Sequence, residues 1–246
     1  MTIDLRIKYQ LQQFKDIVGL KPISELLQRF VTNGSLPSGI LFTGLPGTAK
    51  STLAKLMAKA LLCQNRPPNI PEPCGKCDWC MHFQGNPVFI WGSPYDYSFG
   101  DCTQMQEFES YKKILNESRI TIFDEFSRAE IRIRDMFLCE LEKKSWKSNG
   151  RLMMFTVPTG AYDKIDDAFK QRVTVVKTKP PTRTEIVTWL ASICKAENIQ
   201  VGSNSGLEAI ADIAGNVPRE CLGHLHTLSI YQKPLTESFV LEVLQQ

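Results

Sequence analysis

The stretch GLPGTAKST, residues 44–52, lies one substitution away from the phosphate-binding pattern G-x-x-x-x-G-K-[ST]. In that pattern, backbone N–H groups surround an anion at a helix N-terminus, a lysine reaches the outer phosphates and a hydroxyl ligates magnesium. The strand-like run SGILFTG precedes the stretch and a helical apolar pattern follows it, which is the context that the motif requires. The stretch therefore predicts a nucleotide-binding loop in an α/β fold. The alternative is an ordinary Gly/Pro turn between a strand and a helix.

The departure from the pattern is Ala49, which stands where the second glycine is expected. Its methyl group is costly only if the residue needs a positive φ or if phosphate packs against its Cα. Because position 49 opens the helix, we expect a negative φ and an intact loop. The residues expected to bind nucleotide here are Gly44, Pro46, Gly47, Thr48, Ala49, Lys50, Ser51 and Thr52.

A second motif, ITIFDEF, is an apolar strand that ends in two carboxylates. Asp124 is expected to hold magnesium through water, with the Ser51 hydroxyl as a further ligand, and Glu125 to polarise an attacking water. Two such carboxylates alone would more often be a solvated helix cap. Paired with an upstream phosphate loop, they predict a site for nucleotide hydrolysis, in which Lys50, Asp124 and Glu125 are the catalytic candidates.

Four of the eight cysteines form a cluster in the sequence, at Cys63, Cys74, Cys77 and Cys80. The last three have C-x2-C-x2-C spacing, and Gly75 favours the tight turn that presents two sulfurs together. Four thiolates suit tetrahedral zinc, and a closed site of this kind is structural rather than catalytic. The alternative is a set of unconnected buried thiols. The remaining residues of interest, Cys102, Cys139, Cys194 and Cys221, are expected in the core, and His82 on the surface.

Short apolar strands alternate with longer amphipathic helices along most of the chain, which predicts a parallel sheet covered on both faces. We expect five strands, at 38–44, 88–92, 119–126, 151–157 and 173–178. Beyond the prolines of KTKPPT the pattern is entirely helical. The expected domains are therefore an α/β domain at 1–178, with the zinc module at about 63–82, and a small helical domain at 179–246.

The composition is that of a globular chain, with 22% charged residues and a net charge of +3, which tolerates a nucleic-acid partner without demanding one. No run of apolar residues is long enough for a signal peptide or a membrane span. We expect a cytoplasmic protein.

The order of these features resembles the gamma/tau subunit of the bacterial DNA polymerase III clamp loader, within the AAA+ ATPases. The resemblance covers nearly the whole chain and implies an AAA+ P-loop NTPase fold with a five-stranded parallel sheet, an inserted zinc module and a helical lid. The N-terminal KYQLQQFKDIVG is similar to the family's K-Y-R-P-x-x-F-x-D-[IV]-[IV]-G box, which lines the adenine pocket, and this similarity implies that Val18 contacts the nucleotide. The matching residues are Lys8, Tyr9, Phe14, Asp16, Val18 and Gly19, whereas Gln10 and Leu11 replace Arg-Pro.

Three further roles are implied by the resemblance. AGNVPRECL resembles the sensor 2 segment, which would place Arg219 on the nucleotide phosphates. The polar sensor 1 residue would follow the strand MMFTVP, where counting back from DKIDDAFKQR favours Thr159 over Thr156. KQRV stands where clamp loaders carry Ser-Arg-Cys, so Arg172 would be an arginine finger for a neighbouring subunit's site.

The resemblance also implies the function and the partners. These would be ATP, Mg²⁺ and Zn²⁺ as cofactors, a homo- or hetero-oligomer of AAA+ subunits, and DNA contacted through its phosphates. The oligomer would assemble on DNA with ATP and release on hydrolysis, in replication or repair, with a sliding clamp or another recruited factor. The candidates for DNA contact are Arg128, Arg132, Arg134 and the segment SFGDCTQ.

Two alternatives remain open at this point. One is a DNA-bound regulatory oligomer or filament that recruits another factor without loading a clamp. The other is an ATP-binding structural subunit with little hydrolysis. The resemblance also implies a helical collar domain after the lid, whereas this sequence ends with the lid; either a longer chain was cut there or the natural protein lacks a collar.

Overall fold

The computed structural model describes residues 3–81, 88–91, 119–129, 131–142 and 151–245. The chain divides into two compact units. One unit is Pro22–Thr178, and the other combines Met1–Lys21 with Lys179–Gln246. Each unit has a hydrophobic core of its own.

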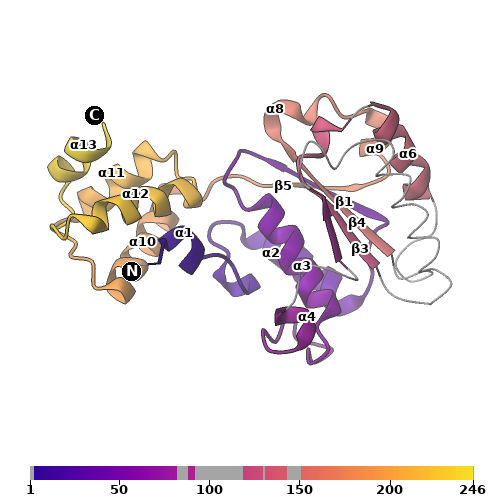
Figure 1. Ribbon diagram of the computed structural model, residues 1–246, viewed down its shortest axis with the longest axis horizontal. Coiled ribbons are helices and arrows are strands. Elements are labelled where there is room, and N and C mark those ends of the chain that lie inside the picture. The colour runs from indigo at the N-terminus through magenta and orange to yellow at the C-terminus, as the bar shows by residue number, and fades with distance from the viewer. Residues whose placement is uncertain (1–2, 82–87, 92–118, 130, 143–150, 246) are drawn as a thin grey trace. The chain divides into compact units, whose positions relative to one another are not determined.

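The larger unit is built on a five-stranded parallel sheet with the spatial order β2-β3-β4-β1-β5 (Figure 1). The strands are β1 (Gly39–Gly44), β2 (Val88–Trp91), β3 (Arg119–Phe123), β4 (Arg151–Pro158) and β5 (Thr174–Lys177). β1 is buried along its whole length between β4 and β5, as expected of a central parallel strand that is covered on both faces. The α/β fold with a parallel sheet is therefore confirmed.

Helices cover both faces of this sheet (Figure 1). They are α2 (Lys21–Asn33), α3 (Lys50–Leu62), α4 (Asp78–Met81), α6 (Ile131–Glu142), α8 (Thr159–Tyr162) and α9 (Asp167–Lys170), with a 3₁₀ turn, η3, at Phe126–Arg128. α3 packs against β1, β3 and β4. On the face covered by α6 and α9, Phe155 of β4 stacks on Phe123 at 5.0 Å between ring centroids and meets Phe169 edge-on at 5.0 Å. These aromatic contacts help to hold β3 against β4, and the acidic motif follows at the carboxyl end of β3.

The second unit is helical, as the sequence predicts. Its helices are α10 (Arg183–Glu197), α11 (Asn204–Ile213), α12 (Pro218–Ile230) and α13 (Glu237–Leu244). α10 begins directly after the prolines because Thr182 and Glu185 form a reciprocal capping box. Pro218 occupies the first turn of α12, where a missing N–H costs nothing.

The N-terminal segment belongs to this helical unit, which differs from the predicted α/β domain of residues 1–178. The short helix α1 (Leu5–Lys8) packs on α12, and Leu5 is buried in the helical core. Lys8 Nζ donates to a carboxylate oxygen of Glu197 at 2.8 Å, and the Tyr9 hydroxyl donates to the other oxygen. These contacts lie between residues about 190 positions apart, so the apolar periodicity of the chain carried no sign of them.

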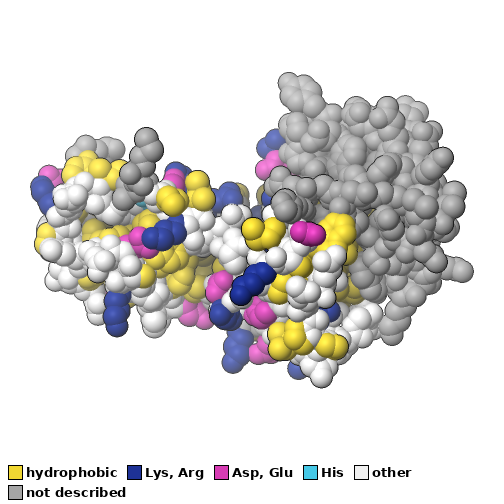
Figure 2. Space-filling model, turned by 60° about the horizontal axis from the view of Figure 1, so that its bottom comes forward, with side chains coloured by type: hydrophobic (Ala, Val, Ile, Leu, Met, Phe, Trp, Pro, Cys, Tyr) yellow, Lys and Arg dark blue, Asp and Glu magenta, His cyan; other side chains and the backbone are white. Residues whose placement is uncertain are grey.

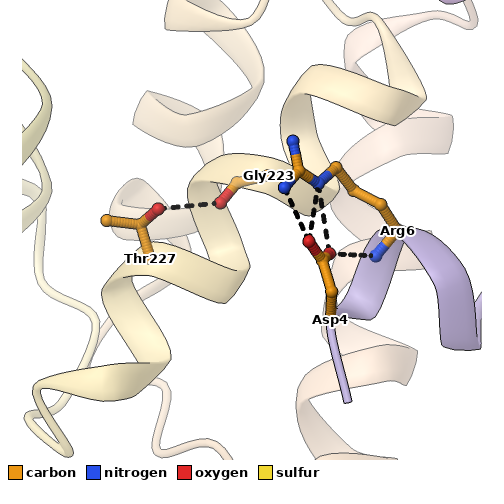
Figure 3. Close-up of polar contacts among 4 residues, drawn as sticks. All are labelled: Asp4, Arg6, Gly223 and Thr227. Carbon is orange, nitrogen blue, oxygen red and sulfur yellow. Dashed lines mark hydrogen bonds and ion pairs between the residues drawn. The ribbon is translucent and has the colours of Figure 1, made fainter. Parts of the chain in front are cut away.

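Figure 3 shows how α1 is stabilised beside α12. Asp4 caps α1 by accepting the N–H of Arg6 at 2.8 Å, and it also accepts the Arg6 guanidinium. The Arg6 side chain passes over Gly223 of α12, where an added Cβ would lie 3.7 Å from the Arg6 Cδ. The Arg6 guanidinium lowers the pKa of Asp4 to about 2.

Lys, Arg, Asp and Glu side chains alternate over the described part of the face shown in Figure 2, without a large patch of one sign. Within the described residues, no helix has the length and apolar character that crossing a membrane requires.

Candidate nucleotide and metal sites

The phosphate-loop sequence forms the turn between β1 and α3, at the carboxyl end of the strand beside the sheet centre. Gly47 has φ +77°, a conformation that glycine adopts without strain. An added Cβ on Gly44 would lie 2.0 Å from Thr178 Oγ1, so the first glycine of the motif is required by close packing. Inside the loop, the buried Thr48 hydroxyl contacts the Leu45 carbonyl at 2.7 Å.

The expected negative φ at Ala49 is wrong, because Ala49 precedes α3 with φ +64° and ψ +18°. The chain must pass through a left-handed residue to turn from the loop into the helix. A left-handed alanine costs on the order of 1 kcal/mol relative to glycine, since its Cβ approaches the following carbonyl. The loop keeps its form at Ala49, but under local strain.

The loop and the acidic motif meet in space. The Ser51 hydroxyl donates to Asp124 Oδ1 at 2.5 Å, joining residues 73 positions apart in the sequence. Lys50 Nζ lies over the loop itself, donating to the carbonyl oxygens of Gly44 at 3.1 Å and Leu45 at 2.8 Å. Hydroxyl and carboxylate oxygens are the ligands that magnesium prefers, so the residue types that meet here fit the predicted metal.

The polar residue beside the acidic pair is Thr156 of β4. Its hydroxyl donates to Asp124 Oδ1 at 2.5 Å and accepts the Glu125 N–H at 3.0 Å. Thr156 is fully buried, whereas Thr159, which the sequence favoured, is exposed at the start of α8. The register Phe123↔Phe155 explains this arrangement, because it places the next residue of each strand side by side. Counting along one segment could not find Thr156, since the pairing of two strands decides its position.

Two residues proposed for catalysis are held in ion pairs. Glu125 has φ +53°, and its Oε2 lies 2.6 Å from Nε of Arg128. Arg172 donates through Nε to Glu142 Oε1 at 2.8 Å and through Nη1 to the Ala168 carbonyl at 2.8 Å. Both pairs lie at the surface, where the net free energy of an ion pair is small and a competing charge displaces it readily.

Of the other candidates for DNA contact, the structure describes the side chain of Arg134. Arg134 donates to the Lys164 carbonyl at 2.5 Å, and its Nε is buried with no described partner, so this side chain ties α6 to the segment before α9. The side chain of Arg132 and the segment SFGDCTQ lie outside the described residues.

The four predicted zinc ligands come together. The Sγ atoms of Cys63, Cys74, Cys77 and Cys80 all lie within 4.8 Å of one another. Two of these pairs are Cys74–Cys80 at 3.9 Å and Cys63–Cys77 at 4.0 Å. Four sulfurs bound to one tetrahedral zinc lie about 3.8 Å apart, so the cluster fits a zinc ion that closes on all four.

Backbone groups and one arginine shape this cluster. The N–H groups of Lys76 and Cys77 donate to Cys74 Sγ and lower the pKa of that thiol to about 6, which favours the thiolate that binds zinc. The Arg66 guanidinium donates hydrogen bonds to several backbone carbonyl oxygens. Two of these are the carbonyl of Ala60, near the end of α3, at 2.8 Å and that of Ile70 at 3.0 Å. Arg66, which the sequence analysis missed, therefore fixes the proline-rich segment between the first two cysteines.

The remaining cysteines differ in their exposure to solvent. Cys194 and Cys221 are buried in the helical core, and burial raises the pKa of Cys221 to about 12. The prediction that Cys139 is a core residue is wrong, because this residue lies on the exposed side of α6. Cys102 and His82 lie outside the described residues.

Two of the predicted nucleotide contacts lie in the helical unit. Val18 is half-buried in the segment that follows α1, and Arg219 is exposed in the first turn of α12. Gly19 has φ +71°, and an added Cβ there would lie 2.4 Å from Pro181. The segment that contains Val18 is thus held against the proline-rich start of residues 179–246.

The fold and the joined loop and acidic motif define a protein of the AAA+ P-loop class. A family model described as "DNA polymerase III, delta subunit" matches residues 19–142, just over half of the chain. The chain belongs to this family.

Individual relatives agree with that assignment. The chain is 26% identical over 234 residues to DNA polymerase III subunit gamma/tau of Mycoplasma pneumoniae, a match that covers 94% of this chain and 33% of the relative. It is 27% identical to subunit gamma of Buchnera aphidicola subsp. Baizongia pistaciae, over 78% of this chain and 51% of the relative. The replication factor C small subunit of Methanosphaera stadtmanae is 25% identical, over 97% and 67%. The predicted relationship to gamma/tau subunits is confirmed, and the chain spans a third to a half of the length of the two bacterial relatives.

Among solved structures, the RuvB Holliday junction branch migration motor of Thermotoga maritima is similar, with a TM-score of 0.67 and 14% identity over 96% of this chain and 72% of that one. At this identity the similarity supports the fold alone.

Proposed function

We propose that the chain binds ATP with Mg²⁺ at the loop of residues 44–52 and hydrolyses it, as one subunit of a clamp-loader-type assembly in DNA replication. The observation that carries this proposal is the 2.5 Å contact between Ser51 Oγ and Asp124 Oδ1. This contact joins the phosphate loop to the acidic end of a strand. An ordinary turn between a strand and a helix does not require such a contact. The relationship to gamma, gamma/tau and replication factor C subunits supports the same reading.

Each residue of the site has a task in this proposal. Lys50 would leave the carbonyl oxygens of Gly44 and Leu45 to neutralise phosphate charge, and Ser51 and Asp124 would hold Mg²⁺. Bound Mg²⁺ would supply charge neutralisation on the phosphates. Glu125 would orient the attacking water, with Thr156 fixing its backbone.

Hydrolysis requires that the Glu125 carboxylate leave Arg128. A DNA phosphate that binds Arg128 would compete with the Glu125 carboxylate for the guanidinium, because both anions accept charge-assisted hydrogen bonds from arginine. DNA binding would then release the carboxylate for catalysis. This competition gives a physical reason for DNA-stimulated hydrolysis.

Assembly is proposed to supply the rest of the site. Arg172 would act on a neighbouring subunit's nucleotide after leaving Glu142, and such fingers contribute on the order of 10³ to 10⁵ in rate. We propose the helical unit as the lid, with Arg219 and Val18 on the nucleotide. The zinc module is proposed as a structural site that stabilises the end of α3.

The test is ATP hydrolysis by the purified chain, with and without duplex DNA. We expect slow hydrolysis that DNA accelerates, and near-complete loss in Glu125→Gln, which retains ATP binding. Lys164→Ala removes an exposed lysine of the same unit and should leave the rate unchanged. Zero hydrolysis in every oligomeric and DNA-bound form would contradict the proposal and leave an ATP-binding structural subunit.

Electron microscopy with DNA and a non-hydrolysable ATP analogue separates the clamp-loader reading from its alternative. A closed or spiral ring of a few subunits that captures a sliding clamp is the expected outcome. A long filament on DNA that retains no clamp would favour the regulatory oligomer.

A further inference from the structure

Two buried threonine hydroxyls connect the phosphate loop to the residue at which the chain leaves the sheet. Thr48 lies inside the loop and Thr178 directly follows β5, and their side-chain oxygens are 2.7 Å apart. Both residues are almost fully buried, at 2% and 6% exposure. Thr178 is also the last residue of its unit, followed by the Lys-Pro-Pro segment that leads to α10.

The pair is packed tightly against the start of the loop. An added Cβ on Gly44 would lie 2.0 Å from the Thr178 hydroxyl oxygen and 3.0 Å from that of Thr48. The backbone N–H of Thr178 donates to the Thr43 carbonyl at 2.7 Å, which extends the ladder of β1 and β5 by one bond. Thr178 therefore contacts the loop through its side chain and the preceding strand β1 through its backbone.

The hydroxyl protons of this pair are too few for its contacts. Thr48 Oγ1 lies 2.7 Å from the Leu45 carbonyl and 2.7 Å from Thr178 Oγ1, and Thr178 Oγ1 lies 3.2 Å from the Thr43 carbonyl. Each hydroxyl carries one proton. Two protons thus serve three contacts, and at any moment one contact lacks a proton of its own.

Lys50 is connected to the same set of contacts. Its Nζ donates to the Leu45 carbonyl at 2.8 Å, which also accepts the backbone N–H of Thr48 at 3.4 Å. If Lys50 moved to a phosphate, this carbonyl would lose its charged donor, which would favour donation from the Thr48 hydroxyl. The Thr178 hydroxyl would then donate to Thr48 Oγ1, and the Thr43 carbonyl would keep the backbone N–H of Thr178.

We propose that Thr178 is a positioning residue of the phosphate loop, whose hydroxyl couples the position of Lys50 to the backbone at the start of the Lys-Pro-Pro segment. The inference rests on the proposed nucleotide binding. Thr178 belongs to neither the phosphate-loop motif nor the acidic motif, so neither motif assigns it this role.

The experiment compares wild type with Thr178→Val, which keeps the shape and removes the hydroxyl, and with Thr178→Ser, which keeps the hydroxyl. Thr174→Val on the same strand is the matched control. Fluorescent ATP-analogue binding gives the affinity. Hydrogen exchange of the segment 176–186, with and without a non-hydrolysable ATP analogue and Mg²⁺, reports the backbone.

We expect nucleotide to change exchange in this segment for wild type, Thr178→Ser and Thr174→Val. In Thr178→Val the change should be lost and nucleotide should bind about fivefold more weakly, the effect of one net hydrogen bond. Thr178→Ala, which adds no methyl group near Gly44, serves if the valine variant fails to fold.

Two other results have distinct meanings. If the hydroxyl-free variant binds nucleotide as wild type does and shows the same exchange response, the inference is wrong and the proposed function stands. If folded wild type binds no nucleotide, the proposed function is wrong and the inference is overturned with it.

Discussion

At the scale of single residues, the phosphate loop carries its strain at Ala49. The rest of the loop follows from packing, because Gly44 makes room for Thr178 and Gly47 adopts a positive φ without cost. Ala49 adopts a positive φ of +64° with a side chain that resists it. The energy of this conformation is measurable by a single substitution.

Ala49→Gly should stabilise the protein. Relief of the left-handed alanine contributes about 1 to 2 kcal/mol, and the greater freedom of glycine in the unfolded chain offsets about half of it. We expect a net gain of about 0.5 to 1 kcal/mol in the free energy of unfolding, measured by urea denaturation. Ala191→Gly, on the exposed side of α10, should instead lose about 1 kcal/mol. Equal losses in both variants would show that Ala49 is unstrained.

A second residue-scale prediction concerns Thr43, whose buried hydroxyl oxygen has no hydrogen-bond partner among the described residues. Burying a hydroxyl without a partner costs about 1 to 3 kcal/mol. Thr43→Val keeps the shape and should raise the free energy of unfolding by about 1 kcal/mol. Thr121→Val, at a buried threonine of β3 that has a partner, should lower it. A loss of stability in Thr43→Val would mean that its hydroxyl is satisfied after all.

At the scale of elements, the sequence predicted what local pattern determines. The five strands and the helices after the prolines follow from apolar periodicity and from proline chemistry, and the C-x2-C-x2-C spacing predicted the group of four cysteines. The sequence could not predict what depends on pairing between distant segments. Thr156 rather than Thr159 contacts Asp124 because of the register between β3 and β4, and α1 joins the helical unit through Glu197. The prediction of a negative φ at Ala49 was wrong for a different reason. The loop extends one residue further than the sequence suggested, so α3 begins at Lys50 and Ala49 still belongs to the loop.

The group of four cysteines gives a prediction based on metal removal. Purified wild type and Cys139→Ser should each hold one zinc ion per chain by elemental analysis, because Cys139 lies outside the cluster. Cys77→Ser should hold none and melt at a lower temperature, since metal binding contributes folding free energy. A strong chelator should expose four further thiols to a thiol reagent. Retention of a full equivalent of zinc in Cys77→Ser would contradict the site.

The docking of α1 predicts a dependence of stability on pH. The Lys8 ammonium and the Tyr9 hydroxyl lower the pKa of Glu197 in the folded protein. A lowered folded pKa stabilises the fold above the unfolded pKa, about 4.3, and this contribution is lost as pH falls through the folded pKa. Glu197→Gln should therefore lose about 1 kcal/mol at pH 7 and little at pH 3, measured by urea denaturation. Exposed Glu242→Gln is the control, and a loss of equal size at both pH values would exclude the ionic cause.

At the scale of the whole molecule, three of the residues proposed for catalysis are held by contacts within the chain itself. Lys50 lies on loop carbonyls, Glu125 pairs with Arg128 and Arg172 pairs with Glu142. Nucleotide, DNA and a neighbouring subunit would each displace one of these three contacts. Under the proposed function, hydrolysis would then require nucleotide, DNA and a neighbouring subunit together.

All of this depends on nucleotide binding at residues 44–52. The most direct test is equilibrium binding of ATP to zinc-loaded protein by calorimetry, in Mg²⁺ and in excess EDTA, for wild type and Lys50→Ala. The account predicts one ATP per chain for wild type in Mg²⁺, much weaker binding in EDTA, and loss of binding in Lys50→Ala. Folded wild type that binds no ATP in Mg²⁺, or a Lys50→Ala variant that binds it equally well, would contradict the account.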